Sequence, residues 1–388
     1  MIGAGHVGLS NMIEGKAAIL GVGMTPFGKH EDRTVEDLAR AAVVAALADA
    51  GLGRDDVQAV FAAHLYQGEV LGQRVLRGLG FPEIPVLNLE NACAGGSSAV
   101  RAGWLAIAAG QYDRVLVIGA EKMGRGLINF VNPDLEQAMG ITAPAQYALA
   151  ARRHMHEFGT PVEGFAEIAV KSRYHAGRNP NAWFRDPVTR DEVLASRPIA
   201  EPLTLLQCCR NGSGAAALVL ASEKWTRAHG RGGPWVRTSA LASWMSDGTQ
   251  KDLTDFGATR RAAIEAYEAT GIGPDAVDAV ELHDAFTCGE LLHYEGLQLC
   301  AKGEGARLAL DGTTRLGGRV PVNVSGGLLA KSHPLGATGV AQFCELTWQL
   351  RGTATGRQVE DARVALAHSQ GGVSLEAGAT CVTLLTRD

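Results

Sequence analysis

One stretch constrains this chain more than any other: residues 91–99 read Asn-Ala-Cys-Ala-Gly-Gly-Ser-Ser-Ala. An apolar run over 84–89, bounded by prolines, precedes it, and a small-residue stretch of helical composition over 99–109 follows it. This pattern predicts that Cys93 lies at a strand-to-helix turn, at the N-terminus of a buried helix. Unpaired N–H groups there would lower the pKa of a thiol and favour a nucleophile. The alternative is a buried, inert cysteine.

Composition narrows the class of protein. The chain has 388 residues, 46% of them apolar and 20% charged, with a net charge of −5. No basic face is evident, so we expect no nucleic-acid partner, and no apolar run reaches the roughly 18 residues of a membrane span. The seven cysteines are odd in number and form no C-x-x-C, which argues against a disulfide framework or a zinc site. We therefore expect a cytoplasmic enzyme without a metal.

The N-terminus carries a misleading motif. Residues Gly3 to Gly8 fit the pattern G-x-G-x-x-G of dinucleotide-binding turns. That pattern is meaningful only between a strand and a helix, and neither is predicted on its two sides. We expect residues 1–14 to form a flexible extension.

Strand and helix patterns alternate along the rest of the chain. Strands are predicted at 16–23, 57–63, 84–89, 114–120, 215–221, 235–242, 277–282, 363–368 and 380–385, and helices at 34–50, 73–79, 99–109, 260–270, 287–302 and 339–350. The alternation predicts an α/β fold with a mostly parallel sheet that is covered on both faces.

The same patterns divide the chain. Residues 15–120 form a first half, and a strand within 206–230 returns to it. Residues 231–388 repeat the same alternation of strands and helices, which suggests an internal duplication. Residues 121–205 lack apolar strands and are rich in Pro, Asn, Arg, His and Trp. They form either an inserted, partly helical region that covers a site or a solvated surface subdomain without a ligand role.

A polar pair closes one of the predicted strands, at His283-Asp284-Ala285-Phe286. Ligands of open α/β sheets bind at the carboxyl ends of strands. His283 could therefore orient a water or donate a proton to a developing oxyanion. The alternative is a structural histidine bonded to the backbone.

Two further stretches are rich in glycine. The first runs from Asn323 through Gly326-Gly327 to His333-Pro334. Its glycines cost backbone entropy, which is explained if the backbone contacts a substrate, and His333 would then be a base or an electrophile near neutral pH. The alternative is a histidine on the surface.

The second glycine-rich stretch is Gly371-Gly372, in the segment His-Ser-Gln-Gly-Gly that follows a strand. Its backbone N–H groups could face an oxyanion. An ordinary tight turn is an equally good interpretation of this local pattern.

Together these stretches resemble the thiolase superfamily, and more narrowly the sterol-carrier-protein-type thiolases and their bacterial and archaeal relatives. The blocks N-A-C-A-G-G-S, H-D-A-F and N-x-x-G-G with H-P-x-G-A-T-G occur in the right order between about residue 16 and the end. The resemblance implies duplicated βαβαβαββ halves in a five-layered α/β/α/β/α core, with 121–205 as an inserted loop domain. It also implies a homodimer or a dimer of dimers.

The resemblance implies an acyl-CoA C-acyltransferase, which performs thiolysis of a 3-oxoacyl-CoA or the reverse Claisen condensation. Cys93 would form the acyl-enzyme, His333 would take the thiol proton, and His283 would complete an oxyanion hole through a water. The N–H groups of Cys93 and of the Gly371-Gly372 turn would form a second oxyanion hole. Coenzyme A would be a substrate, and no cofactor is implied.

From the entropy cost of its glycines, we expect the loop of Asn323, Gly326 and Gly327 to contact substrate or coenzyme A. The chain departs from the family pattern at the second acid/base. Many relatives carry a cysteine in a C-x-G turn near the C-terminus, and sterol-carrier-type relatives can use the cysteine of H-D-C-F. Here the first turn has no cysteine, and Ala285 occupies the second position.

The remaining acid/base candidates are His368, Cys288 or a water. The vicinal pair Cys208-Cys209 is interpreted as core packing.

Two other functions compete with acyl transfer. A thiolase-fold lyase could cleave a CoA thioester by a retro-aldol reaction without an acyl-cysteine. The missing second acid/base favours this mildly, whereas the presence of Cys93, His283 and His333 weighs against it. A thiolase-like subunit could instead supply a CoA pocket within a complex with an OB-fold or zinc-ribbon partner protein.

Overall fold

The computed structural model describes residues 16–124, 126, 128, 135–245, 252–372 and 377–387. The predicted extension 1–14 and its glycine motif lie outside the described residues. Among the described helices, none is long and apolar enough to cross a membrane.

The first half of the chain follows the order βαβαβαββ. Its elements are β1 (Ala17–Met24), α1 (Val35–Ala50), β2 (Ala59–Ala63), α2 (Leu71–Arg77), β3 (Val86–Leu89), α3 (Gly95–Ala108), β4 (Arg114–Glu121) and β7 (Gly214–Ser222). Helix α1 begins where its sequence predicts, because the Thr34 side chain accepts a hydrogen bond from the Asp37 backbone N–H in a capping box. A short α8 (Glu223–Ala228) follows β7.

The second half repeats that order. Its elements are β8 (Trp235–Met245), α9 (Gly257–Thr270), β9 (Ala279–Glu281), α10 (Thr287–Gly296), α11 (Gly305–Leu310), α12 (Gly327–Lys331), α13 (Leu335–Arg351), β10 (Val364–Gly372) and β11 (Ala377–Thr386). A single parallel bridge from Val322 to Val280 stands where the first half has β3. Helix α10 ends before the predicted residue 302, and Gln298 beyond it has a positive φ of 59°.

The strands form one nine-stranded sheet in the order β3-β2-β4-β7-β1-β8-β11-β10-β9. In the first half β1 is antiparallel to β7, β7 is antiparallel to β4, and β4 is parallel to β2. Strands β8, β11, β10 and β9 repeat these orientations, so the described residues confirm the duplication. The prediction of a mostly parallel sheet is wrong, because β7 and β11 each run against both of their neighbours.

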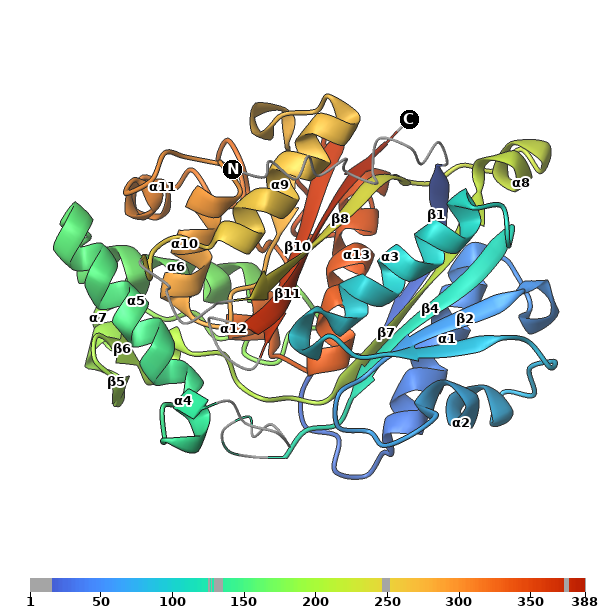
Figure 1. Cartoon of the computed structure of the whole chain (residues 1–388), viewed down its shortest axis with the longest axis horizontal. Helices are drawn as coiled ribbons and strands as arrows, with labels where there is room; N and C mark the ends of the chain where they lie inside the picture. Colours follow the sequence, from blue (N-terminus) through green and yellow to red (C-terminus); the bar gives the residue numbers. More distant parts are fainter. Residues whose placement is uncertain are drawn as a thin grey trace, which may run out of the picture.

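Helices α3 and α13 lie between the two halves of the sheet (Figure 1). One buried core joins both helices to strands of both halves. Helix α1 covers the outer face of the first half, and α9 and α10 cover the outer face of the second half. The result is the predicted five-layered α/β/α/β/α arrangement, joined at one edge where β1 pairs with β8 through Ala17–Val236 and Ala18–Trp235.

The two central helices meet backbone to backbone. A Cβ placed on Gly339 of α13 would lie 2.4 Å from the Ser97 backbone nitrogen, and a Cβ on Gly96 of α3 would lie 2.9 Å from the Gly336 carbonyl oxygen. Side chains at these positions would force the helices apart. The close approach also brings together the turns that precede the two helices, one carrying Cys93 and the other His333.

The region between β4 and β7 is mostly helical. It contains α4 (Leu135–Ala138), α5 (Ala143–Phe158), α6 (Val162–Ala176), α7 (Arg190–Ala195), β5 (Pro198–Ala200) and β6 (Leu203–Thr204). Helix α5 packs on α10, and α6 packs on α10, α11 and α12. The domain boundaries at 121, 206 and 231 stay a prediction.

Candidate active site

Cys93 lies at the predicted strand-to-helix turn. Strand β3 leads into a 3-10 turn over Ala92–Ala94, and α3 begins at Gly95. Ala92 has a positive φ of 47°, an uncommon conformation for a residue with a side chain. The turn leaves Cys93 only 8% exposed.

The predicted lowering of the Cys93 pKa is wrong. Burial, together with the nearby carboxylates of Glu121 and Glu90, raises the pKa of Cys93 to about 12 against an opposing backbone hydrogen bond. Loss of hydration outweighs the partial positive charge of the first helical turn here. The resting nucleophile is therefore a neutral thiol that needs a base.

His333 is held so that one ring nitrogen is free to act as that base. Its Nδ1 lies 2.8 Å from Thr338 Oγ1, and this hydroxyl donates to the Pro334 carbonyl at 3.0 Å. The hydroxyl must therefore accept from His333, which places the proton on Nδ1 and leaves Nε2 bare. Nε2 is buried without a hydrogen-bond partner among the described residues. Burial and the neighbouring His283 lower the pKa of His333 well below its usual value, so the ring is neutral.

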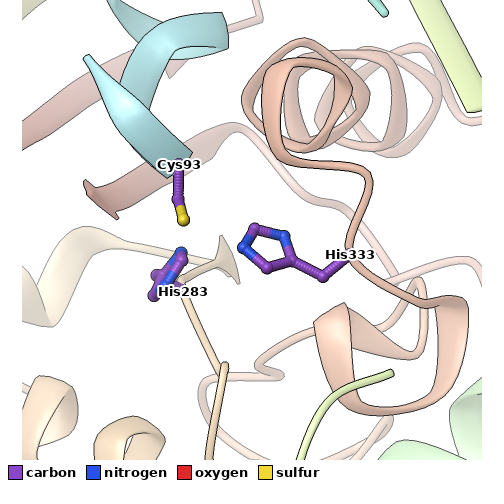
Figure 2. A group of neighbouring side chains, drawn as sticks. All are labelled: Cys93, His283 and His333. Atoms are coloured by element: carbon purple, nitrogen blue, oxygen red, sulfur yellow. The ribbon is translucent and has the colours of Figure 1, made fainter. Parts of the chain in front are cut away.

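His283 follows β9 and faces the same point (Figure 2). Its ring lies 5.2 Å from that of His333 at an angle of 78°. The Cys93 sulfur and one nitrogen of each ring lie within 4.8 Å of one another, close enough to hold a metal ion. Burial lowers the pKa of His283 to about 3, so this ring is also neutral.

His368 lies behind His283 and not in the cavity. Its Nδ1 accepts the backbone N–H of His283 at 3.3 Å, and its Nε2 lies 3.1 Å from Thr259 Oγ1. Both ring nitrogens are occupied, and the ring is fully buried. The structure therefore places His368 as a support for His283 and removes it from the groups that could touch a substrate.

Cys288 is not brought to the cavity. It lies on α10 within the core and is fully buried. Its thiol donates to the Tyr147 carbonyl at 3.4 Å. The sequence offered Cys288 as an acid/base because it lies three residues after Ala285, but the helical turn directs it away from the cavity.

The glycine-rich loop before His333 is a support and not a substrate surface. Asn323 Oδ1 accepts the Leu282 N–H at 2.8 Å, and its Nδ2 donates to Glu290 at 2.9 Å. Gly326 and Gly327 have φ values of 98° and 61°. Neither these glycines nor Asn323 lines the cavity. The prediction that this loop contacts substrate or coenzyme A is therefore wrong.

Asp284 explains why the loop needs glycine. Its carboxylate accepts the N–H groups of Leu328 at 2.7 Å and Leu329 at 3.3 Å. A Cβ on Gly327 would lie 2.1 Å from Asp284 Oδ2. The neighbouring residues His283 and Asp284 thus divide two tasks: one faces the cavity, and the other anchors the loop that leads to His333.

Gly371 and Gly372 do not form a turn. They end strand β10 and pair with Ala379 and Gly378 of β11. A Cβ on Gly371 would lie 2.6 Å from the Cys93 backbone nitrogen, so glycine allows the strand to approach the nucleophile's turn. Both glycines line the cavity beside Cys93.

Cys93, His283, His333 and the Gly371-Gly372 segment line a cavity of about 930 Å³. Residues of the inserted region, among them Tyr147, Trp183 and Arg197, form part of its wall, which favours a covering role over a purely solvated one. Cys208 and Cys209 also line it, so core packing is only part of their environment. The described lining holds no carboxylate, although the chain as a whole is acidic.

Three cations, Lys29, Arg197 and Arg210, belong to the same lining, and all are exposed. Sequence analysis missed them, as it missed Thr338 and Tyr147. The only local signal was the position of Thr338 within the block that follows His333. The others come from separate segments, and no motif joins them.

Comparisons with known proteins agree over nearly the whole chain. Residues 17–224 match the family model "Thiolase, N-terminal domain", and residues 240–384 match "Thiolase C-terminal domain-like". The chain is 39% identical to sterol carrier protein 2 of Oryctolagus cuniculus, over 94% of this chain and 71% of that one. It is 40% identical to the benzoylsuccinyl-CoA thiolase subunit BbsB of Thauera aromatica, over 93% and 96%.

Further matches extend these relationships. The chain is 37% identical to the acetyl-CoA acetyltransferase of Methanothermobacter thermautotrophicus, over 95% of this chain and 99% of that one. Among solved structures, the Ltp2-ChsH2(DUF35) aldolase matches with a TM-score of 0.82 and 30% identity, over 97% of this chain and 99% of that one. Human mitochondrial 3-ketoacyl-CoA thiolase shares the fold with a TM-score of 0.72 at 17% identity, over 97% and 99%.

The raised pKa of Cys93 predicts an unusual alkylation profile. Because the thiolate fraction grows about tenfold per pH unit below the pKa, labelling of Cys93 by iodoacetamide should still rise between about pH 8 and 10. Mass spectrometry of the Cys93 peptide measures the rate. The same chain unfolded in urea is the control, and its profile should level off near the ordinary thiol pKa of about 8.5. A plateau below about pH 8 in the folded protein would contradict the raised pKa.

Proposed function

Because this chain belongs to the thiolase family, we propose that it is an acyl-CoA C-acyltransferase that carries its acyl group on Cys93. The observation that carries this proposal is the meeting of three groups in one cavity: a protonated thiol, a bare imidazole nitrogen and a second neutral imidazole. A nucleophile, a base and an oxyanion donor are what acyl transfer to an enzyme requires.

In the first step His333 takes the proton of the Cys93 thiol while the sulfur attacks a carbonyl carbon of the substrate. The raised pKa of Cys93 and the lowered pKa of His333 make this transfer unfavourable in the empty cavity. It becomes favourable when the negative charge moves on to the substrate oxygen, because the new imidazolium and oxyanion then attract each other in a poorly hydrated site. Proton transfer and attack are therefore coupled.

The developing oxyanion needs hydrogen-bond donors already in place. His283 supports one oxyanion hole, because its ring is neutral, lies beside His333 and is fixed through its backbone by His368. The close approach of Gly371 to the backbone of Cys93 supports a second donor group near the sulfur. Donors that need not reorganise during the reaction stabilise the transition state most effectively.

We propose a coenzyme A thioester as the substrate, with coenzyme A as substrate and not as a cofactor. The cavity wall combines aromatic side chains near the nucleophile with the exposed cations Lys29, Arg197 and Arg210. This asymmetry suits a ligand with an apolar acyl end and a phosphate-bearing end. Two relatives, the acetyl-CoA acetyltransferase and the benzoylsuccinyl-CoA thiolase subunit, carry names that include such a coenzyme A thioester.

A retro-aldol lyase is the second candidate, and the match to the Ltp2-ChsH2(DUF35) aldolase favours it. A lyase of this kind has no need for an acyl-cysteine. We keep acyl transfer as the main proposal because the Cys93 sulfur lies within 4.8 Å of a ring nitrogen of His333, which supports a nucleophile and its base. The same match, together with a relative named as a subunit, supports a small partner protein of the OB-fold and zinc-ribbon kind.

We also propose a homodimer formed at strand β3. This strand is one of the two outer strands of the nine-stranded sheet, and Leu87 on it is 48% exposed. An unpaired apolar edge is a template for pairing with a second copy. All seven cysteines are free thiols, which supports a reducing compartment such as the cytoplasm.

Incubation with acetyl-CoA should acylate Cys93. Intact-mass spectrometry should show the addition of one acetyl group, and peptide mapping should place it on Cys93. Cys93→Ala should abolish the adduct, and His333→Ala should slow its formation by about 100-fold or more. Cys344→Ala, a buried cysteine remote from the cavity, is the control. Absence of an adduct, with retro-aldol activity retained in Cys93→Ala, would establish the lyase instead.

Arg210 should recognise the phosphate end of the substrate. Arg210→Gln is expected to raise KM for acetyl-CoA by about tenfold, because a charge-assisted contact contributes about 1.5 kcal/mol. KM for the N-acetylcysteamine thioester, which lacks the phosphates, should not change. Arg260→Gln on α9, outside the cavity lining, is the matched control. An equal rise in KM for both thioesters would argue against a phosphate contact.

Leu87→Arg should convert a dimer into a monomer, because it places a charge in the proposed apolar edge contact. Light scattering of the purified chain measures the mass of the species in solution. Val44→Arg on α1, where the side chain is 54% exposed, is the control and should leave the dimer intact. A wild-type monomer, or a dimer that survives Leu87→Arg, would overturn this interface.

A further inference from the structure

Thiolysis of a 3-oxoacyl-CoA includes one proton transfer for which the site described above supplies no donor. When the C2–C3 bond of a 3-oxoacyl-CoA breaks, its electron pair remains on C2, and that carbon must receive a proton. His333 is occupied with the proton of Cys93, and His283 is a donor to the oxyanion. The chain therefore needs another acid that faces Cys93, and neither His368 nor Cys288 reaches the cavity.

Cys209 is placed where such an acid is needed. Its backbone N–H donates to the Ala285 carbonyl at 2.8 Å, and Cys208 forms an antiparallel bridge with Phe286. The Cys208-Cys209 segment therefore lies alongside the segment that begins with His283. Cys209, Ala285, His283 and Cys93 all line the same cavity. Ala285 has only a methyl side chain and therefore fills little of this part of the cavity wall.

The two vicinal thiols differ in their surroundings. The Cys208 thiol donates to the Thr204 carbonyl at 3.3 Å and is thereby occupied. The Cys209 thiol has no hydrogen-bond partner among the described residues. Burial raises the pKa of Cys209 well above its usual value, and the nearby groups Cys208, Cys93 and Asp284 raise it further. The Cys209 thiol is therefore protonated at neutral pH and able to give its proton to a stronger base such as a carbanion.

Tyr147 is the other protic group in this wall. Its ring packs against Phe286 with centroids 4.5 Å apart, and burial raises the pKa of its phenol above its usual value. A phenol starts from an ordinary pKa of about 10, against about 8.5 for a thiol, so it is the weaker acid. Tyr147 is consequently the comparison variant in the test below.

We propose that Cys209 is the second acid/base of this enzyme, an inference that rests on the acyltransferase function proposed above. As the C2–C3 bond breaks, C2 takes the proton of the Cys209 thiol, which leaves a Cys209 thiolate, an acyl-Cys93 thioester and a protonated His333. The Cys209 thiolate then takes the proton of an incoming coenzyme A thiol, and the resulting coenzyme A thiolate attacks the acyl-Cys93 thioester. Cys93 leaves as a thiolate and recovers its proton from His333, so every proton and charge is restored.

The test separates carbon protonation from acylation. In D2O the wild-type enzyme should exchange the α-hydrogens of acetyl-CoA for deuterium, measured by mass spectrometry of the recovered thioester. Cys209→Ala should lose this exchange by at least about 100-fold, and should lose overall thiolysis similarly. Acetylation of Cys93 by p-nitrophenyl acetate, whose leaving group departs as a stable anion and needs no proton from Cys209, should stay within about threefold of wild type in the same variant. This also shows that the variant is folded.

Two variants serve as controls. Cys208→Ala removes the neighbouring thiol that is bonded to Thr204, and Tyr147→Phe removes the phenol but keeps the ring in the cavity wall. In both variants exchange should stay well above that of Cys209→Ala. Exchange at the wild-type rate in Cys209→Ala would overturn the inference, and so would its loss in Tyr147→Phe alone. A wild-type enzyme that becomes acetylated but exchanges no deuterium would also overturn it. Failure of Cys93 to become acetylated would instead refute the proposed function itself.

Discussion

The contact between helices α3 and α13 is the constraint on which this molecule depends. Gly96 and Gly339 allow the two helices to touch through their backbones. Each helix belongs to a different half of the duplication, and each is preceded by a turn that carries a reactive side chain, Cys93 in one half and His333 in the other. Neither half contains a complete site. Catalytic geometry therefore follows from the packing of the two halves, and any change in the separation of the helices changes the distance from thiol to base.

Two buried carboxylates fix the turns that this contact brings together. Glu121 accepts the N–H groups of Gly336 at 3.0 Å and Leu65 at 2.8 Å, so it secures the start of α13 from the end of β4. Asp284 secures the loop on the other side of His333. The negative charge of Glu121 also helps to raise the pKa of Cys93. The group that positions the base thus also keeps the nucleophile protonated until a substrate arrives.

Sequence reasoning succeeded where a signal is local. The helix that begins at Thr34, the turn at Cys93 and the alternation of strands and helices in both halves each depend on a few consecutive residues, and the structure confirms them. It failed where a glycine serves a partner remote in sequence. Gly327 makes room for Asp284, yet it looked like a substrate-facing residue. Gly371 makes room for the backbone of Cys93 and lies in a strand, where the pattern predicted a turn. The position of the proton on His333 depends on a hydrogen bond to Thr338, which the sequence pattern does not show. The cations of the cavity wall come from separate segments, so no short stretch of sequence groups them.

The raised pKa of Cys93 also depends on residues remote in sequence, and it affects the chemistry of the whole site. A helix N-terminus favours a thiolate, but that effect is modest, whereas burial among carboxylates and neutral imidazoles is costly for a thiolate at Cys93. His283 and His333 are buried in the same way and Cys209 is partly buried, and the loss of hydration keeps each of them neutral. The empty site therefore holds no charge on these four groups. Charges arise in pairs only when a substrate oxygen or carbon can share them, which restricts proton transfer to the occupied cavity and leaves an idle thiol poorly reactive.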